Sequence, residues 1–385
     1  MQIQFFQQLT HDLKQHGTGT PQLIVDMATF EHNLNIVRQY LPCQLQPRLV
    51  VKSLACIELL KNACSVLKTQ RFMVFHQPHL SMILQHFPDA DILLGKPMPI
   101  RAMSDFYQQY PHYRNANIQW LIDGQARLQQ YLSYAEQQSV CLSLNIEIDV
   151  GLHRGGIATD AQFRQCLDRI AQYPQQLKFS GLMGYDAHVS KVPQIIQSTA
   201  QSYQQSQKMY QHYQDIIRQD YPQLWQNDLC FNGGGSPSFR LHCEKTVCND
   251  LAFGSMLLKP STFDSEFLKQ FQCALWIATP VLKVLDYAQL PALDILNKLP
   301  HRDQAAFVYG GYWLADYVYP KNSRPHSLYG RSSNQEMVQI PKATRIAMDD
   351  YIFLRPQQSE AILPQFAQLY AYRQGGFCAW QTFRE

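Results

Sequence analysis

Lys52 is the residue of this chain whose position most clearly suggests chemistry. It follows the apolar run Leu49–Val51, at the point where a short buried strand would give way to a loop. A lysine amine held beside the core at such a point can attack an aldehyde and form a Schiff base. A lysine after a strand is more often simply solvated, so the interpretation depends on the residues that occupy equivalent positions elsewhere.

Glycine and polar residues follow the later apolar runs. Three consecutive glycines allow backbone N–H groups to converge on an anion, although a flexible surface turn is the alternative. An arginine stays cationic and can hold a phenolate oxygen or a carboxylate, although an ion pair with Asp149 is the alternative. The candidates are Arg154 after the fifth run, Tyr185 and His188 after the sixth, Gly233, Gly234, Gly235 and Ser236 after the seventh, and Gly254 and Ser255 after the eighth.

Eight apolar runs alternate with segments of helical periodicity, which predicts an α/β fold. The predicted strands are Leu49–Val51, Phe72–Phe75, Asp91–Leu94, Ile118–Ile122, Leu142–Ile148, Phe179–Met183, Leu229–Phe231 and Val247–Leu251. The predicted helices include Ile57–Leu67, Gln125–Ala135, Ala161–Tyr173 and Pro193–Arg218. Eight right-handed crossovers favour a closed (β/α)8 TIM barrel, whose site lies at the carboxyl ends of the strands. An open, doubly wound sheet is the alternative.

The pattern changes after about residue 255. Strand-like runs punctuated by proline and glycine replace the helical segments, which predicts a mainly β domain. These runs are Cys273–Val284, Ala305–Val308, Glu336–Ile340, Tyr351–Leu354 and Gln368–Arg373. We therefore expect a barrel over residues 22–255 and a β domain formed by residues 1–21 and 256–385. The early run Gln22–Asp26 could add a strand to that β domain.

The composition excludes several classes of protein. Of the 385 residues, 46% are apolar and 16% charged, as in a well-cored globular protein. A formal charge of +3, without a run of basic residues, gives no indication of a nucleic-acid partner. No segment reaches the ~18 unbroken apolar residues of a membrane span. Ten cysteines without a CxxC pair favour reduced thiols in a cytoplasmic protein.

A Schiff-base lysine, an anion-binding glycine loop and an arginine on one rim describe a site for pyridoxal 5′-phosphate. The stretches TPQLIVDMATFEHNL, PRLVVKS, EIDVGLHRGG, GLMGYDAHV and NGGGSP, between residues 20 and 260, carry a specific resemblance. They are similar to the signatures of fold-type III pyridoxal-phosphate enzymes of the alanine racemase superfamily. The D-threonine aldolase and D-serine dehydratase branch is the most similar. The resemblance implies an alanine-racemase-type barrel with a C-terminal β domain, usually as a homodimer.

The same resemblance implies roles for individual residues. Lys52 is the expected catalytic residue, and it is expected to bind the cofactor together with the arginine, glycine, serine, tyrosine and histidine residues named above. Lyases of the branch generally bind a divalent metal through a histidine and a cysteine or aspartate, two positions apart after a proline. Here those positions hold Gln358 and Glu360. Glutamine is a poor ligand for zinc, so we expect no metal site.

The expected activity is that of a lyase on a D-β-hydroxy-α-amino acid, by retro-aldol cleavage or dehydration. An amino-acid racemase without metal is one alternative, because His188 or Tyr185 could act as a second base. A non-catalytic carrier of pyridoxal phosphate is another, although such carriers consist of a barrel without a second domain. In each case the expected partner is a small molecule.

Overall fold

The computed structural model describes residues 2–191, 195, 197–288 and 300–383, and the chain divides into two compact units. The first, here called the barrel unit, comprises Leu34–Met256 and Ser265–Lys269. The second, called the sheet unit, comprises the chain up to Asn33, Leu257–Asp264 and the chain from Gln270 onward. Each unit has its own sheet.

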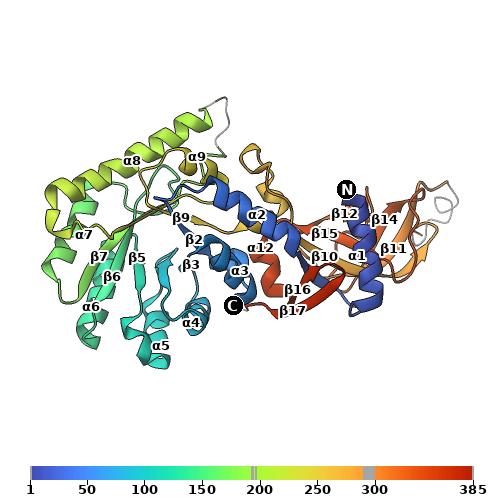
Figure 1. Cartoon of the computed structure of the whole chain (residues 1–385), viewed down its shortest axis with the longest axis horizontal. Helices are drawn as coiled ribbons and strands as arrows, with labels where there is room; N and C mark the ends of the chain where they lie inside the picture. Colours follow the sequence, from blue (N-terminus) through green and yellow to red (C-terminus); the bar gives the residue numbers. More distant parts are fainter. Residues whose placement is uncertain (1, 192–194, 196, 289–299, 384–385) are drawn as a thin grey trace. The chain divides into compact units, whose positions relative to one another are not determined.

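The barrel unit contains a closed barrel of eight parallel strands, β2 to β9, each bonded to the next and β9 to β2 (Figure 1). This closure confirms the predicted (β/α)8 barrel and rules out the open sheet. Short, almost fully buried strands explain why the apolar runs were recognisable in the sequence. The strands are β2 (Gln46–Val50), β3 (Arg71–Val74), β4 (Asp91–Leu94), β5 (Ile118–Ile122), β6 (Leu142–Glu147), β7 (Leu177–Gly184), β8 (Cys230–Gly233) and β9 (Asp250–Phe253).

Helices follow the barrel strands as the sequence periodicity predicts. Helix α3 has the predicted bounds, and α8 begins at Thr199 because Ser198 and Gln201 form a capping box there. Pro193, the start of the helix predicted in this segment, lies outside the described residues. The helices are α2 (Met27–Tyr40), α3 (Ile57–Leu67), α4 (Gln77–His86), α5 (Ile100–Gln109), α6 (Gln125–Gln138), α7 (Asp160–Gln172), α8 (Thr199–Asp220), α9 (Phe239–Glu244) and α10 (Ser255–Leu258).

A buried ion pair fixes the register between the first and last barrel strands. The guanidinium of Arg48, in β2, donates to both carboxylate oxygens of Asp250, in β9, over 2.7 and 2.9 Å. It also donates to Asp91 over 3.0 Å. A buried pair of this kind stabilises the fold only when both partners are satisfied, as they are here. Asp250 begins β9, so the ion pair lies toward the amino ends of the strands. The opposite, carboxyl ends are available to form a site.

The sheet unit contains a nine-stranded sheet among the described residues. The predicted strand at Gln22–Asp26 belongs to it, since β1 pairs antiparallel with β10 and parallel with β16. Three strands were not predicted, namely β12, β13 and β17. The strands are β1 (Gln22–Asp26), β10 (Leu275–Leu285), β11 (Asp303–Tyr309), β12 (Ala315–Tyr319), β13 (Arg324–Pro325), β14 (Gln335–Pro341), β15 (Tyr351–Pro356), β16 (Gln368–Arg373) and β17 (Gly376–Gln381).

An amino-terminal helix, α1 (Gln2–His16), packs on this sheet and was also not predicted. Phe6, Leu9 and Leu13 recur on one face of the helix and are buried in a cluster with Trp276 and Phe353. The Phe6 ring lies edge-on to Trp276, with 5.0 Å between ring centres. The helix therefore completes the core of the sheet unit.

Candidate active site at the carboxyl ends of the barrel strands

Lys52 lies in the turn that leaves the carboxyl end of β2. The strand ends at Val50 and a short 3-10 helix, η1 (Val51–Leu54), follows directly. The Lys52 Nζ atom lies 4.6 Å from the centre of the Phe75 ring, which follows β3. An ammonium group over an aromatic face is favourable, so this contact holds the amine beside the neighbouring strand end.

The turn that carries Lys52 contacts the loop after the last barrel strand. The buried hydroxyl of Ser255 donates a hydrogen bond to the buried hydroxyl of Ser53 over 2.9 Å. At Gly254, a Cβ atom would lie only 2.9 Å from the Ser53 Cβ and from the Val50 carbonyl oxygen. The approach therefore requires glycine. Sequence analysis did not select Ser53, although it stands beside the lysine in the stretch PRLVVKS.

The glycine loop after β8 joins the same group of contacts. Gly234 has a φ of +73°, and a Cβ there would overlap the Cδ1 atom of Leu251, so only glycine fits without strain. Ser236, in the short helix η4 (Ser236–Ser238), accepts a hydrogen bond from the Met256 backbone N–H over 3.1 Å. The loops after β8 and β9 are thereby tied together.

Tyr185 connects the glycine loop to Arg154. A Cβ at Gly235 would lie 3.0 Å from the Cε2 atom of Tyr185, so the ring packs on the loop backbone. The guanidinium carbon of Arg154 lies 4.8 Å from the centre of the same ring. Contacts therefore run from Ser53, beside Lys52, through the loops after β9, β8 and β7 to the arginine after β6.

Asp149 shapes the loop that carries Arg154. One carboxylate oxygen accepts from the backbone N–H groups of Gly151 and His153, over 2.9 and 3.0 Å, and the other lies 2.6 Å from His153 Nδ1. Burial alone would raise the pKa of Asp149, but the bonds from His153 and Gly151 outweigh burial and hold it below the ordinary value. Burial raises the pKa of the neighbouring Glu147, and the positive charge of Arg154 opposes that shift.

His188 has a buried nitrogen that can accept a hydrogen bond. Its Nε2 atom lies 3.3 Å from the Ser206 hydroxyl, which donates its proton to the Val150 carbonyl oxygen. Ser206 must therefore accept, which assigns the imidazole proton to Nε2. The Nδ1 atom is buried and has no hydrogen-bond partner among the described residues. Burial lowers the pKa of His188, which favours the neutral ring.

The two positions that the resemblance relates to metal ligands lie in the sheet unit. Gln358 is exposed and immediately precedes helix α12 (Ser359–Ile362), in which the Glu360 carboxylate accepts from the Ser359 hydroxyl over 3.3 Å. Across the described ranges, no group of three or more histidine, cysteine, aspartate or glutamate residues is arranged to hold a metal ion.

No helix in the described part of the chain has the length and apolar character to cross a membrane.

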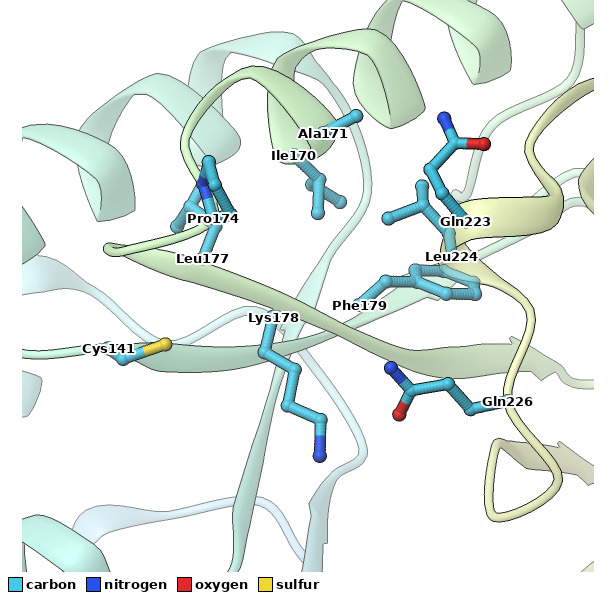
Figure 2. A pocket seen from close by; sticks show the side chains of 10 residues that line it. All are labelled: Cys141, Ile170, Ala171, Pro174, Leu177, Lys178, Phe179, Gln223, Leu224 and Gln226. Atoms are coloured by element: carbon cyan, nitrogen blue, oxygen red, sulfur yellow. The ribbon is translucent and has the colours of Figure 1, made fainter.

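A pocket of about 410 Å³ lies near the beginning of β6 and β7, away from the residues described above (Figure 2). Cys141 precedes β6, and Leu177, Lys178 and Phe179 begin β7. None of the residues that line this pocket belongs to the contact series that begins at Ser53. Because barrel enzymes place their sites at the carboxyl ends of the strands, this pocket is not the candidate active site.

Comparisons with known proteins agree with this architecture. Residues 25–257 match the family model described as alanine racemase, N-terminal domain. D-threonine aldolase from Filomicrobium marinum is 15% identical, with a TM-score of 0.72 over 94% of this chain and 96% of that chain. D-threo-3-hydroxyaspartate dehydratase from Delftia sp. HT23 is 14% identical, with a TM-score of 0.72 over 95% and 98%.

A third similar structure is alanine racemase from Bacillus anthracis with bound L-Ala-P. It is 13% identical, with a TM-score of 0.72 over 94% of this chain and 97% of that chain. At such identities the likeness establishes the fold alone. No curated protein sequence matches the chain closely enough to add a relative.

Proposed function

Because the chain belongs to the alanine racemase N-terminal domain family, we propose that it binds pyridoxal 5′-phosphate and acts on a D-amino acid. One observation carries the proposal, namely the series of contacts that links the turn of Lys52 to the glycine loop and to Arg154. Ser53, Ser255, Gly235 and Tyr185 form that series. This series supports the proposal because it links a lysine turn, a glycine loop and an arginine at one end of the barrel.

The residues present fit this cofactor. Lys52 would bind its aldehyde, and Gly233, Gly234, Gly235, Ser236, Gly254 and Ser255 would hold its phosphate. Glycine is required at Gly234 and Gly254 because side chains would not fit there, and the backbone N–H groups of consecutive glycines can converge on an anion. Arg154, Tyr185 and His188 would contact the ring, and the buried Nδ1 atom of His188 lacks a partner among the described residues.

The cofactor, when bound, supplies an electron sink for the α-carbon of an attached amino acid. The chain supplies the rest of the chemistry. The Lys52 amine would accept or return the α-proton at Nζ. Arg154 would orient an oxygen anion, because its guanidinium stays charged. His188 would hold a hydrogen bond or a proton at Nδ1, because its Nε2 proton is committed to Ser206.

We propose a lyase on a D-β-hydroxy-α-amino acid as the reaction. The names of two similar structures, a D-threonine aldolase and a D-threo-3-hydroxyaspartate dehydratase, support this class. Removal of the β-hydroxyl proton leads to retro-aldol cleavage, whereas protonation of the same oxygen leads to loss of water. The protein therefore determines the product by the group that it places beside that hydroxyl.

Racemisation of an amino acid is the second candidate. Gln358 and Glu360, in place of a metal-binding pair, favour it, because a racemase needs two bases and no metal. His188 or Tyr185 could be the second base, although contact with the cofactor ring is the more ordinary role for both. The sheet unit argues against a third candidate, a non-catalytic carrier, since carriers of this fold lack it. We also propose that the active form is a homodimer.

The function can be tested with the purified chain loaded with pyridoxal phosphate. Absorbance near 420 nm, followed by borohydride reduction and peptide mass spectrometry, should locate the cofactor on Lys52. Incubation with D-threonine and D-serine should give glycine and acetaldehyde, or pyruvate and ammonia. Exchange of the α-proton for deuterium with loss of optical purity would indicate the racemase instead. Cofactor on Lys52 without either outcome would indicate the carrier.

A further inference from the structure

We propose that the buried ion pair between Asp186 and His242 positions the glycine loop Gly233–Gly235 and thereby determines how tightly the phosphate of the cofactor is held. This inference rests on the proposed function, because it concerns the same phosphate site. Sequence analysis gave no role to either residue, although Asp186 lies in the stretch GLMGYDAHV. Both would act through the loop backbone, so they are positioning residues.

The pair is almost completely withdrawn from solvent. Asp186 is 2% exposed and His242 is 1% exposed. The Nε2 atom of His242 lies 2.8 Å from one carboxylate oxygen of Asp186, and the Ser238 hydroxyl donates to the other oxygen over 2.7 Å. Asp186 follows Tyr185 in the loop after β7, whereas Ser238 and His242 follow the glycine loop after β8. The pair therefore joins two neighbouring loops of the rim.

The hydrogen bonds around the ring show that both of its nitrogens carry protons. The Gln207 side-chain oxygen accepts from the Val247 backbone N–H, so it must also accept from the Thr246 hydroxyl. The proton of Thr246 is thereby committed, and the hydroxyl can only accept from His242 Nδ1, which lies 2.9 Å away. The Nε2 proton faces Asp186. The pair is accordingly an imidazolium and a carboxylate.

The imidazolium packs directly against the glycine loop. A Cβ at Gly233 would lie 3.2 Å from His242 Cε1, and a Cβ at Gly234 would lie 3.0 Å from His242 Cδ2. The Tyr185 ring packs on the next glycine, Gly235. The backbone of three glycines is intrinsically free to adopt many conformations. Here it is confined by its contacts with the histidine and the tyrosine.

This confinement predicts a selective effect on phosphate binding. Backbone N–H groups hold an anion well only when they converge on it, so the loop must keep one conformation. If one partner of the pair is removed, the other remains as an uncompensated buried charge, and the adjoining backbone must move to relieve it. The phosphate would lose its donors, whereas the aldehyde would still meet Lys52.

The test compares pyridoxal phosphate with pyridoxal, which lacks the phosphate, by spectroscopic titration of the wild type, His242→Gln and Asp186→Asn. We expect each variant to bind pyridoxal phosphate about 10- to 100-fold more weakly, because each substitution removes a hydrogen bond to a charged group. Pyridoxal affinity should change by less than about twofold in the same variants. His212→Gln is the matched control, since His212 and Asp160 form a similar pair 2.8 Å apart on the exposed surface.

The outcomes separate this inference from the proposed function. Folded variants with unchanged affinity for pyridoxal phosphate, or with equal losses for both ligands, would overturn the positioning role but not the function. A wild-type protein that binds neither ligand would overturn both. Circular dichroism and thermal unfolding without ligand establish that each variant is folded. If the two variants do not fold, Ser238→Ala removes only the hydroxyl donor to Asp186, and the same selective loss is expected.

Discussion

The guanidinium carbon of Arg154 lies 4.8 Å from the centre of the Tyr185 ring. The two residues belong to loops after different strands, β6 and β7, and the tyrosine ring also packs on Gly235 after β8. One aromatic ring thus contacts both the arginine and the glycine loop. That spacing matters because the phosphate and the ring oxygen of the proposed cofactor must be reached at the same time.

Replacement of Tyr185 by leucine should weaken the binding of pyridoxal phosphate by about two- to fivefold, the equivalent of one exposed cation–π contact. Tyr185→Phe keeps the aromatic face and should retain most of the affinity, which makes it the matched control. Absorbance titration of the two purified variants measures the difference. Equal affinities for the leucine and phenylalanine variants would show that the ring does not position Arg154.

Replacement of Gly234 by alanine should destabilise the protein and weaken cofactor binding. An alanine at a φ of +73° is strained by about 1–2 kcal/mol, and the overlap with Leu251 adds about 1–3 kcal/mol. Gly19→Ala is the control, because Gly19 has a φ of +71° with nothing near its would-be Cβ. Urea unfolding should show the larger loss at Gly234, and only that variant should lose affinity. Equal losses of stability would contradict the crowded geometry.

Removal of divalent metals should leave the activity within about twofold of that of the untreated protein, because an amide and a single carboxylate cannot hold a transition metal tightly. Gln358 and Glu360 are the residues on which this expectation depends. Dialysis against EDTA, followed by assay with D-threonine and D-serine, measures it, and parallel samples receive Zn²⁺ or Mn²⁺ again. Activity that disappears on dialysis and returns with a metal would show that other residues bind it.

The barrel could be predicted because its strands are short, buried and therefore continuously apolar. The prediction was least accurate where the interior is polar. The last strand was placed at Val247–Leu251, but β9 begins at Asp250 and ends at Phe253. Asp250 is a polar residue inside the predicted run, and in the fold it pairs with the buried Arg48 of the neighbouring strand β2. An ion pair between residues 202 positions apart cannot be read from local periodicity.

Two of the elements of the sheet unit that were not predicted, α1 and β17, were missed for opposite reasons. Helix α1 carries an available signal, since Phe6, Leu9 and Leu13 follow the spacing of a helix face. Strand β17 gives almost none, because it is an outer strand with mostly exposed or half-buried side chains. An outer strand is defined by backbone pairing with its neighbour, and the side-chain pattern does not record that pairing.

Short motifs in the sequence are enough to select Lys52 and the three glycines as candidates, and the roles assigned to them stay predictions. The residues that hold those motifs in place were not predictable in the same way. Asp186 and His242 are 56 positions apart, and each looks like an ordinary polar residue in its own segment. Their pairing arises only when β7 and β8 lie side by side.

The stability that the Asp186–His242 pair provides should depend on pH. Burial alone would lower the pKa of His242, but the carboxylate of Asp186 outweighs burial and raises it to about 10. Tyr203, whose ring centre is 5.1 Å away, and Cys248 also face the ring. A group whose pKa is higher in the folded state stabilises that state fully below its unfolded value of about 6.5. The contribution is lost as the pH rises through about 10.

The free energy of unfolding should therefore fall by about 3 kcal/mol on His242→Gln at pH 6, as for a broken buried ion pair, and by progressively less as the pH approaches 10. Urea unfolding of both proteins at a series of pH values measures this difference. The control is the same measurement in the Asp186→Asn variant. Without the carboxylate, His242→Gln should change the free energy of unfolding by an amount that varies little between pH 6 and 10. A difference that stays constant from pH 6 to 10 in the wild-type background would mean that His242 is not held as an imidazolium.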